Sequence, residues 1–159
     1  TLEYVRQGRN CAVLRTFSKA WALAGLRVGY GVMPEDIATV LKQVREPFNV
    51  GIMAQAAALA SLKDPEQVER SMANNRAGKD YLYEQFEQMG LEFVPTQSNF
   101  VMVNVGIDSN QCFDALMRHG VTVRTGDIFD LPTWIRVTIG LPEENETFIA
   151  ALRDVLDNA

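Results

Sequence analysis

The sequence predicts a mixed fold, α/β in its first part and α+β in the remainder. Apolar stretches typical of strands alternate along the chain with amphipathic or alanine-rich stretches typical of helices. The later strands are short and separated by helical patterns, as in a small sheet with helices packed on one face. The 159 residues are 47% hydrophobic and 22% charged, which is ordinary for a globular chain with a real core.

Composition and charge exclude several classes of protein. Fifteen Lys and Arg against 20 Asp and Glu give a net charge of −5, which argues against a nucleic-acid partner. No apolar run reaches the roughly 18 residues of a membrane span, and no signal-peptide pattern is visible. Cys11 and Cys112 lie far apart without metal-ligand spacing, so we expect no disulfide, no metal site and a cytoplasmic location. Because the chain begins with Thr1 rather than Met, we expect a fragment or a processed product.

Two strands and a helix are predicted in the first part of the chain. Residues 11–17 are largely apolar and lead into a turn, which indicates a buried strand entering a loop. Residues 26–32 are predicted as a second strand, whose glycines mark places of close approach. Pro34 and the two acidic residues after it suit the first turn of a helix, which should end just before Pro47.

Two further helices lead into the second part. Residues 52–62 are rich in alanine and are predicted as a helix. A longer helix should begin after Asp64, because a capping acceptor there is followed by Pro65, and should end at Gly90.

The last part of the chain is predicted as a small sheet with two helices. The strands are expected at residues 91–94, 99–105, 121–124 and 134–139, and the helices at 111–119 and 143–156. In the first of these helices, Phe113, Leu116 and Met117 should share the core face.

Lys19 is the main candidate for catalysis. It follows an apolar strand, and apolar surroundings would favour its neutral amine, which can attack an aldehyde. Two hydroxyl groups lie close to it in sequence, at Thr16 and Ser18, and Arg27 follows in the next predicted strand. Two hydroxyls and a guanidinium suit a phosphate dianion. An amine beside a phosphate-binding group is what pyridoxal phosphate requires.

The segment TFSKAWALAGLRVGY at positions 16–30 resembles the cofactor-lysine segment of the class I/II, fold type I aminotransferases. The resemblance continues through PFNV at 47–50 and QSNF at 97–100, covers essentially the whole chain, and is nearest to the histidinol-phosphate aminotransferase branch. It implies that Lys19 carries pyridoxal 5'-phosphate and moves protons during catalysis. It also implies that Thr16, Ser18 and Arg27 hold the cofactor phosphate.

Two arginines support that branch. Alternation in residues 134–139 places Arg136 on the face opposite Ile135 and Val137, and Arg124 similarly opposes the valines before it. Both arginines lie on predicted neighbouring strands. By the resemblance, Arg136 binds the α-carboxylate of an amino acid and Arg124 binds a substrate phosphate, each by bidentate recognition.

The resemblance also implies a domain organisation. Residues 1–50 would be the C-terminal part of a large pyridoxal-phosphate-binding domain, and residues 51–159 the small C-terminal α+β domain. The family's first half supplies an aromatic ring that stacks on the cofactor, an aspartate for the pyridine nitrogen and a tyrosine. We therefore expect this chain alone to be inactive and the full-length protein to be a homodimer acting on a small amino-acid or phosphorylated substrate.

Several functions remain open. The leading hypothesis is a transaminase of histidine biosynthesis that moves an amino group between glutamate and imidazole-acetol phosphate. An aromatic amino-acid aminotransferase would not need Arg124 to bind phosphate. A pyridoxal-phosphate decarboxylase acting on a phosphothreonine-like substrate would keep Lys19 but release carbon dioxide. A non-catalytic interaction module is a different class, which nothing in the composition favours.

Overall fold

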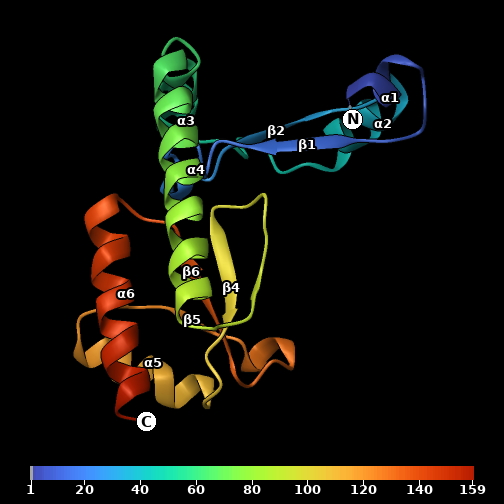
Figure 1. Cartoon of the computed structure of the whole chain (residues 1–159). Helices are drawn as coiled ribbons and strands as arrows, with labels where there is room; N and C mark the ends of the chain where they lie inside the picture. Colours follow the sequence, from blue (N-terminus) through green and yellow to red (C-terminus); the bar gives the residue numbers. More distant parts are fainter. Residues whose placement is uncertain (1) are drawn as a thin grey trace. The chain divides into compact units, whose positions relative to one another are not determined.

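The structure, a computed structural model, describes residues 2–159 and divides into two compact units. The first unit extends to Ser71 and the second begins at Met72, further along the chain than the predicted domain boundary at residue 50. Both units combine helices with antiparallel strands (Figure 1), so the predicted mixed fold is confirmed. The assignment of residues 1–50 to a larger domain stays a prediction. Among residues 2–159 no helix is both long enough and apolar enough to cross a membrane.

The first unit is built around a two-stranded antiparallel sheet. Its elements are α1 (Leu2–Arg6), β1 (Val13–Thr16), the 3₁₀ helix η1 (Ala24–Leu26), β2 (Gly29–Val32), α2 (Glu35–Val44), α3 (Ile52–Ser61) and the start of α4 (Pro65–Gln88). Thr16 pairs with Gly29. A Cβ atom on Gly29 would lie 2.7 Å from the carbonyl oxygen of Arg15, so the expected close approach is confirmed. The strand predicted from residue 26 begins only at Gly29, because the preceding residues wind into η1.

A small apolar cluster fixes the end of this sheet. Phe17 directly follows β1 and Val28 directly precedes β2, and both are buried against Ala54 and Ala58, which share one face of α3. The partly buried side chains at the margin are Trp21, Leu23 and Val50. The same unit leaves many large apolar side chains exposed, among them Leu14, Tyr30, Val44, Phe48 and Ile52.

The second unit is a four-stranded antiparallel sheet in the order β3-β4-β6-β5. Its further elements are β3 (Phe93–Val94), β4 (Phe100–Asn104), α5 (Ser109–Arg118), β5 (Arg124–Thr125), the 3₁₀ helix η2 (Asp127–Phe129), β6 (Trp134–Thr138) and α6 (Pro142–Asp157). The strand predicted at residues 121–124 is displaced, because only Arg124 and Thr125 pair with β6.

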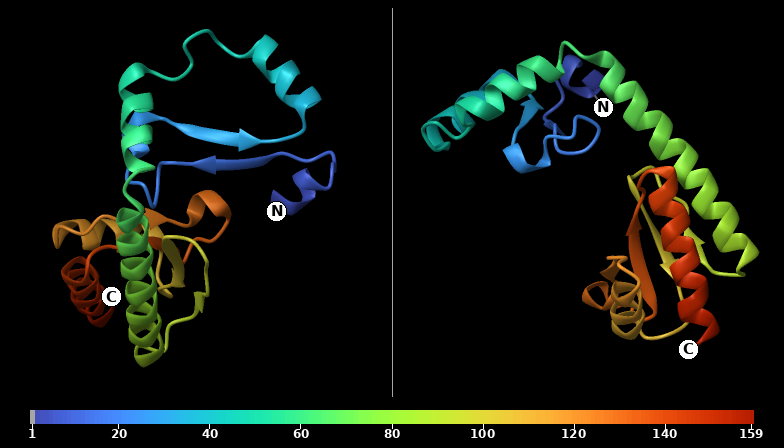
Figure 2. Two further views of the ribbon diagram at one scale, coloured as in Figure 1. Left: turned by 90° about the horizontal axis from the view of Figure 1, so that it is seen from above. Right: turned by 90° about the vertical axis from the view of Figure 1, so that its left-hand side faces the viewer.

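One face of this sheet carries the core. Val101 and Val103 of β4 and Ile135 and Val137 of β6 alternate with residues of the opposite face, as the sequence predicts. Helices α4, α5 and α6 cover this core face (Figure 2), and their buried residues include Leu82, Phe86, Cys112, Leu116, Phe148 and Leu152. Met117 is exposed, so the prediction that it faces the core is wrong, and Cys112 takes that place on α5. The other face of the sheet carries both apolar and polar side chains, among them Phe100 of β4 and Arg136 of β6.

The limits of α4 follow from local signals. The Gln67 backbone N–H donates to Asp64 Oδ1 at 3.1 Å, which satisfies one of the free N–H groups of the first turn. Gly90 follows the helix with a φ of 68°, a left-handed conformation that suits glycine. Both ends therefore agree with the prediction.

Buried Asn145 holds the turn between β6 and α6. The Gly140 N–H donates to Asn145 Oδ1 at 3.0 Å, and Asn145 Nδ2 donates back to the Gly140 carbonyl at 3.3 Å. Asn74 of α4 donates to the same carbonyl at 2.9 Å. Because buried amides need partners, this network fixes the end of the strand that carries Arg136.

Candidate active site

Lys19 lies in a tight turn at the end of the paired strands of the first unit. Its carbonyl accepts a hydrogen bond from the Ala22 N–H at 2.8 Å, and the Phe17 carbonyl accepts one from the Leu23 N–H at 3.0 Å. Phe17 is buried, and its ring centroid lies 5.7 Å from that of Trp21, so the residues on both sides of the lysine are anchored. The Lys19 side chain itself is exposed. The expected desolvation of its amine by apolar neighbours is therefore not found in this chain.

The two hydroxyl groups predicted beside the lysine lie together. Thr16 Oγ1 donates to Ser18 Oγ at 2.7 Å and accepts from the Ser18 backbone N–H at 3.0 Å. This local turn holds both side chains at the end of β1, before Lys19. Each oxygen keeps a lone pair that can accept, and rotation of a hydroxyl can supply a donor to an anion.

Arg27 is brought to the same end of the sheet. The Phe17 N–H donates to the Val28 carbonyl at 3.1 Å. This bond joins the segment that leads into Lys19 to the segment that ends with Arg27 and Val28. Arg27 has a φ of 54°, and its Nη1 donates to the Ala24 carbonyl at 2.6 Å. This bond uses one of the five N–H donors of the guanidinium and leaves the others free for a ligand.

The loop between Lys19 and Arg27 has an unusual backbone. Ala22 and Arg27 both have positive φ values, 57° and 54°, although neither is glycine. Such conformations cost on the order of 1 kcal/mol or more and persist where the surrounding structure imposes them. They are frequent at ligand sites, which agrees with a role for this loop in binding.

Arg124 and Arg136 form the second group of predicted site residues, in the second unit. They are cross-strand partners in the antiparallel pair of β5 and β6, so they share the face of the sheet that the helices leave open. Neither forms an ion pair with a carboxylate in the part of the chain that the structure describes. The acid nearest in sequence, Asp127, accepts instead from the Thr125 hydroxyl at 2.5 Å, which lowers the pKa of that carboxyl. The two guanidinium groups are thus available to an anion.

A cavity of about 340 Å³ lies beside these arginines. Its lining is Thr122, Val123, Arg124, Arg136 and Thr138. Two positive charges and two hydroxyls without an acidic residue make a site suited to phosphate or carboxylate. Residues two apart in a strand share a face, which predicts Thr138 beside Arg136 and Thr122 beside Arg124. Both threonines could therefore have been predicted from the sequence as neighbours of the arginines.

Sequence reasoning missed Phe100. The Arg136 guanidinium carbon lies 4.8 Å from the centroid of the Phe100 ring. This contact depends on the pairing of β4 with β6, which joins segments far apart in sequence. No local pattern indicates that these two distant segments will pair.

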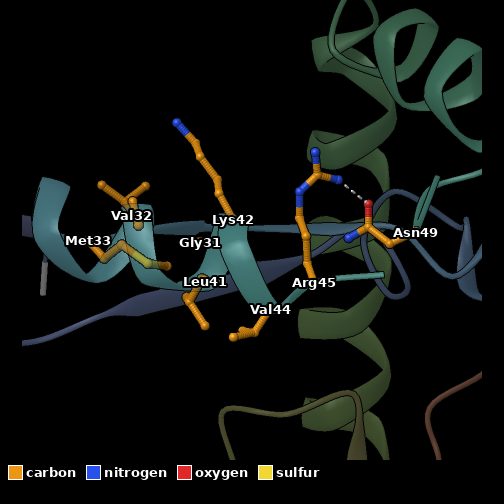
Figure 3. A pocket seen from close by; sticks show the side chains of 9 residues that line it. Gly31, Val32, Met33, Leu41, Lys42, Val44, Arg45 and Asn49 are labelled. Carbon is orange, nitrogen blue, oxygen red and sulfur yellow. Dashed lines mark hydrogen bonds between the residues drawn. The ribbon is translucent and has the colours of Figure 1, made fainter. Parts of the chain in front are cut away.

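A larger cavity in the first unit has a different character. It measures about 580 Å³ and lies between β2 and α2 (Figure 3). Figure 3 shows Arg45 bonded to Asn49, with Nη1 donating to Oδ1 at 2.8 Å, beside the apolar side chains of Met33, Leu41 and Val44. None of the predicted site residues lines this cavity, so it is not part of the candidate site.

Comparisons with known proteins show the family of the chain. Residues 2–152 match the family "Aminotransferase class I and II". Over 98% of its own length, the chain is 56% identical to the histidinol-phosphate aminotransferase of Moorella thermoacetica. It is 50% identical to that of Akkermansia muciniphila, again over 98% of this chain. A solved histidinol-phosphate aminotransferase of Sinorhizobium meliloti, in complex with pyridoxal-5'-phosphate, superposes with a TM-score of 0.83 at 29% identity, over 92% of this chain and 41% of that one. The chain covers 41% and 43% of the first two relatives, about two-fifths of their length.

Proposed function

The chain belongs to the class I and II aminotransferases, and we propose that the full-length protein is a pyridoxal-phosphate-dependent histidinol-phosphate aminotransferase. It would exchange an amino group between glutamate and imidazole-acetol phosphate. The relatives that carry this name are 56% and 50% identical to the chain. The observation that carries the proposal is the direct pairing of Arg124 with Arg136 beside a cavity without acidic residues.

The residues of the Lys19 turn fit the cofactor. The paired hydroxyls of Thr16 and Ser18 and the free donors of Arg27 suit its phosphate, and the exposed amine of Lys19 is accessible to its aldehyde. When bound, the pyridine ring supplies an electron sink for the charge left when an amino acid loses its α-proton. Lys19 Nζ is the proposed base that takes this proton from the substrate Cα.

The two arginines would bind the anionic groups of the two substrates. We assign the α-carboxylate of glutamate to Arg136 and the phosphate of the phosphorylated substrate to Arg124. Both anions match the planar fork of a guanidinium, which can donate two parallel hydrogen bonds. Thr122 and Thr138 line the same cavity and can add hydroxyl donors.

We further propose that the full-length protein is a cytoplasmic homodimer. The cytoplasmic location rests on the separate cysteines and on the biosynthetic relatives. The dimer is supported by the exposed apolar side chains of the first unit, such as Val44, Phe48 and Ile52, which a partner subunit could bury. Residues 1–50 would belong to the large cofactor-binding domain and residues 51–159 to the small one.

A covalent trapping experiment tests the role of Lys19. The full-length protein is incubated with pyridoxal phosphate, reduced with borohydride and mapped by mass spectrometry. The mass increase should lie on Lys19, should be lost in Lys19→Gln and should remain in Lys42→Gln, a matched change at another exposed lysine. An adduct on other lysines only, or none, would refute the assignment of the cofactor site.

A substrate comparison tests the reaction. Histidinol phosphate, phenylalanine and O-phosphothreonine are offered to the same protein with 2-oxoglutarate. We expect amino transfer to be fastest with histidinol phosphate. A preference for phenylalanine would favour the aromatic aminotransferase, and release of carbon dioxide from O-phosphothreonine would favour the decarboxylase.

A further inference from the structure

The contact between Arg136 and Phe100 has a role that the proposed function does not include. We propose that Phe100 is a positioning residue, whose ring holds the Arg136 guanidinium beside the cavity for the glutamate carboxylate. The proposal rests on the proposed carboxylate role of Arg136.

The register places Phe100 diagonally across from Arg136. Phe100 pairs with Thr138, and Met102 pairs with Arg136, in the antiparallel pair of β4 and β6. A diagonal neighbour is within reach of a long side chain on the same face. The guanidinium carbon lies 4.8 Å from the ring centroid, and both side chains are half-buried. This distance is within the range of a cation–π interaction, which strengthens as water is removed.

The arginine pair needs such a contact. Like charges directly opposite one another on a sheet repel, and Arg124 lies directly opposite Arg136. Arg136 Nε is buried and has no hydrogen-bond partner among residues 2–159. Without an attractive partner, this conformation would be costly. The negative face of the ring supplies that attraction.

An aromatic ring also has an advantage over a carboxylate in this position. An Asp or Glu would hold the guanidinium equally well, but it would occupy the N–H donors that a substrate anion must use. A ring stabilises the cation from its face and leaves the in-plane donors free. Phe100 can therefore fix Arg136 without competing with the substrate.

The first test compares two half-reactions in the full-length holoenzyme. We expect Phe100→Leu to raise KM for glutamate about tenfold with kcat nearly unchanged, and to leave KM for histidinol phosphate within about twofold. Phe100→Tyr, which keeps the ring, should restore KM for glutamate. The matched control is Phe113→Leu, a half-buried phenylalanine on α5 that packs against the core. Equal increases in both KM values would show a general structural effect and would overturn the proposal.

The second test separates electrostatics from shape. Fluorinated phenylalanines introduced at position 100 weaken the negative face of the ring with little change in size, so KM for glutamate should rise stepwise with the number of fluorine atoms. A flat response overturns the proposal even if the leucine variant fails to fold. Arg136→Gln tests the underlying function separately. If it leaves KM for glutamate unchanged, the carboxylate role of Arg136 is wrong. If it raises KM while the Phe100 series does not, only the role of Phe100 is wrong.

Discussion

Arg124 and Arg136 lie directly opposite one another on the antiparallel strands β5 and β6. The sequence places them on neighbouring predicted strands, and the structure adds that they are cross-strand partners on the face without helices. Two cations in this arrangement repel, and an anion that lies between or beside them offsets this repulsion. The pairing therefore leads to a specific prediction about the binding of an anionic substrate by Arg124.

In the full-length protein, Arg124→Ala should affect the two proposed substrates differently. Loss of a charge-assisted, bidentate contact should lower kcat/KM for histidinol phosphate about 100-fold, while the half-reaction with glutamate changes less than about threefold. Single-turnover kinetics of the two half-reactions measure this split. Arg118→Ala, at an exposed arginine of α5, is the matched control. If both half-reactions fall equally, Arg124 does not bind the phosphate.

Gly78→Ala should destabilise the chain although it lies in the middle of α4. In an open helix this change would stabilise by roughly 0.5–1 kcal/mol. Here the added Cβ would lie 2.5 Å from Ile139 Cγ2 and 3.0 Å from Asn145 Nδ2. The cost of overpacking should outweigh the gain in helix propensity, so the free energy of unfolding should fall by about 1–2 kcal/mol.

Urea denaturation monitored by far-ultraviolet circular dichroism measures the effect of Gly78→Ala. Ala73→Gly, at an exposed position of the same helix, calibrates the propensity term. A higher midpoint for Gly78→Ala would mean that Ile139 and Asn145 move aside at no cost, contrary to this expectation.

Asp108→Ala should loosen the start of α5. Asp108 Oδ1 accepts from the backbone N–H groups of Asn110 and Gln111, both at 3.0 Å. Loss of this cap should cost about 1 kcal/mol, and hydrogen exchange at the two N–H groups should accelerate. Asp114→Ala, at an exposed position of the same helix, should leave their exchange unchanged.

Cys112 should be unreactive in the folded chain. Burial raises the pKa of its thiol to about 11 from an ordinary value of 9.0, so little thiolate is present near pH 8. Iodoacetamide should modify half-buried Cys11 first and Cys112 only after unfolding. Rapid modification of Cys112 in the native chain would contradict this expectation.

The same shift predicts a loss of stability in alkali. The thiol keeps its proton up to a higher pH in the folded chain than in the unfolded chain. Its contribution to the free energy of unfolding is therefore complete below about pH 9 and is lost as the pH rises towards 11. Cys112→Val should therefore lose less stability than the natural chain between pH 8 and pH 10. The urea midpoint at the two pH values gives this difference.

Features set by local chemistry were predictable from the sequence. The ends of α4 follow from Asp64, Pro65 and Gly90, each of which acts on its own turn of backbone. The open and core faces of β6 follow from strict alternation around Arg136. The paired hydroxyls of Thr16 and Ser18 are likewise close in sequence.

Features set by contacts between distant segments were not predictable. The limits of β5 depend on which residues pair with the distant strand β6, and the ring contact of Arg136 depends on the register of β4. The exposure of Lys19 shows a further limit. Apolar residues beside it in sequence pack with one another, so they do not desolvate its amine.

The β1–β2 ribbon has a practical consequence for work with this 159-residue chain. It is a sheet of only two strands, so among the described residues each strand has one edge whose N–H and C=O groups face no further strand, and Leu14 is 71% exposed beside them. Such edges can recruit strands from other molecules. Concentrated solutions should therefore aggregate by intermolecular β-pairing, and a charged residue introduced by Leu14→Lys should delay the growth of light scattering.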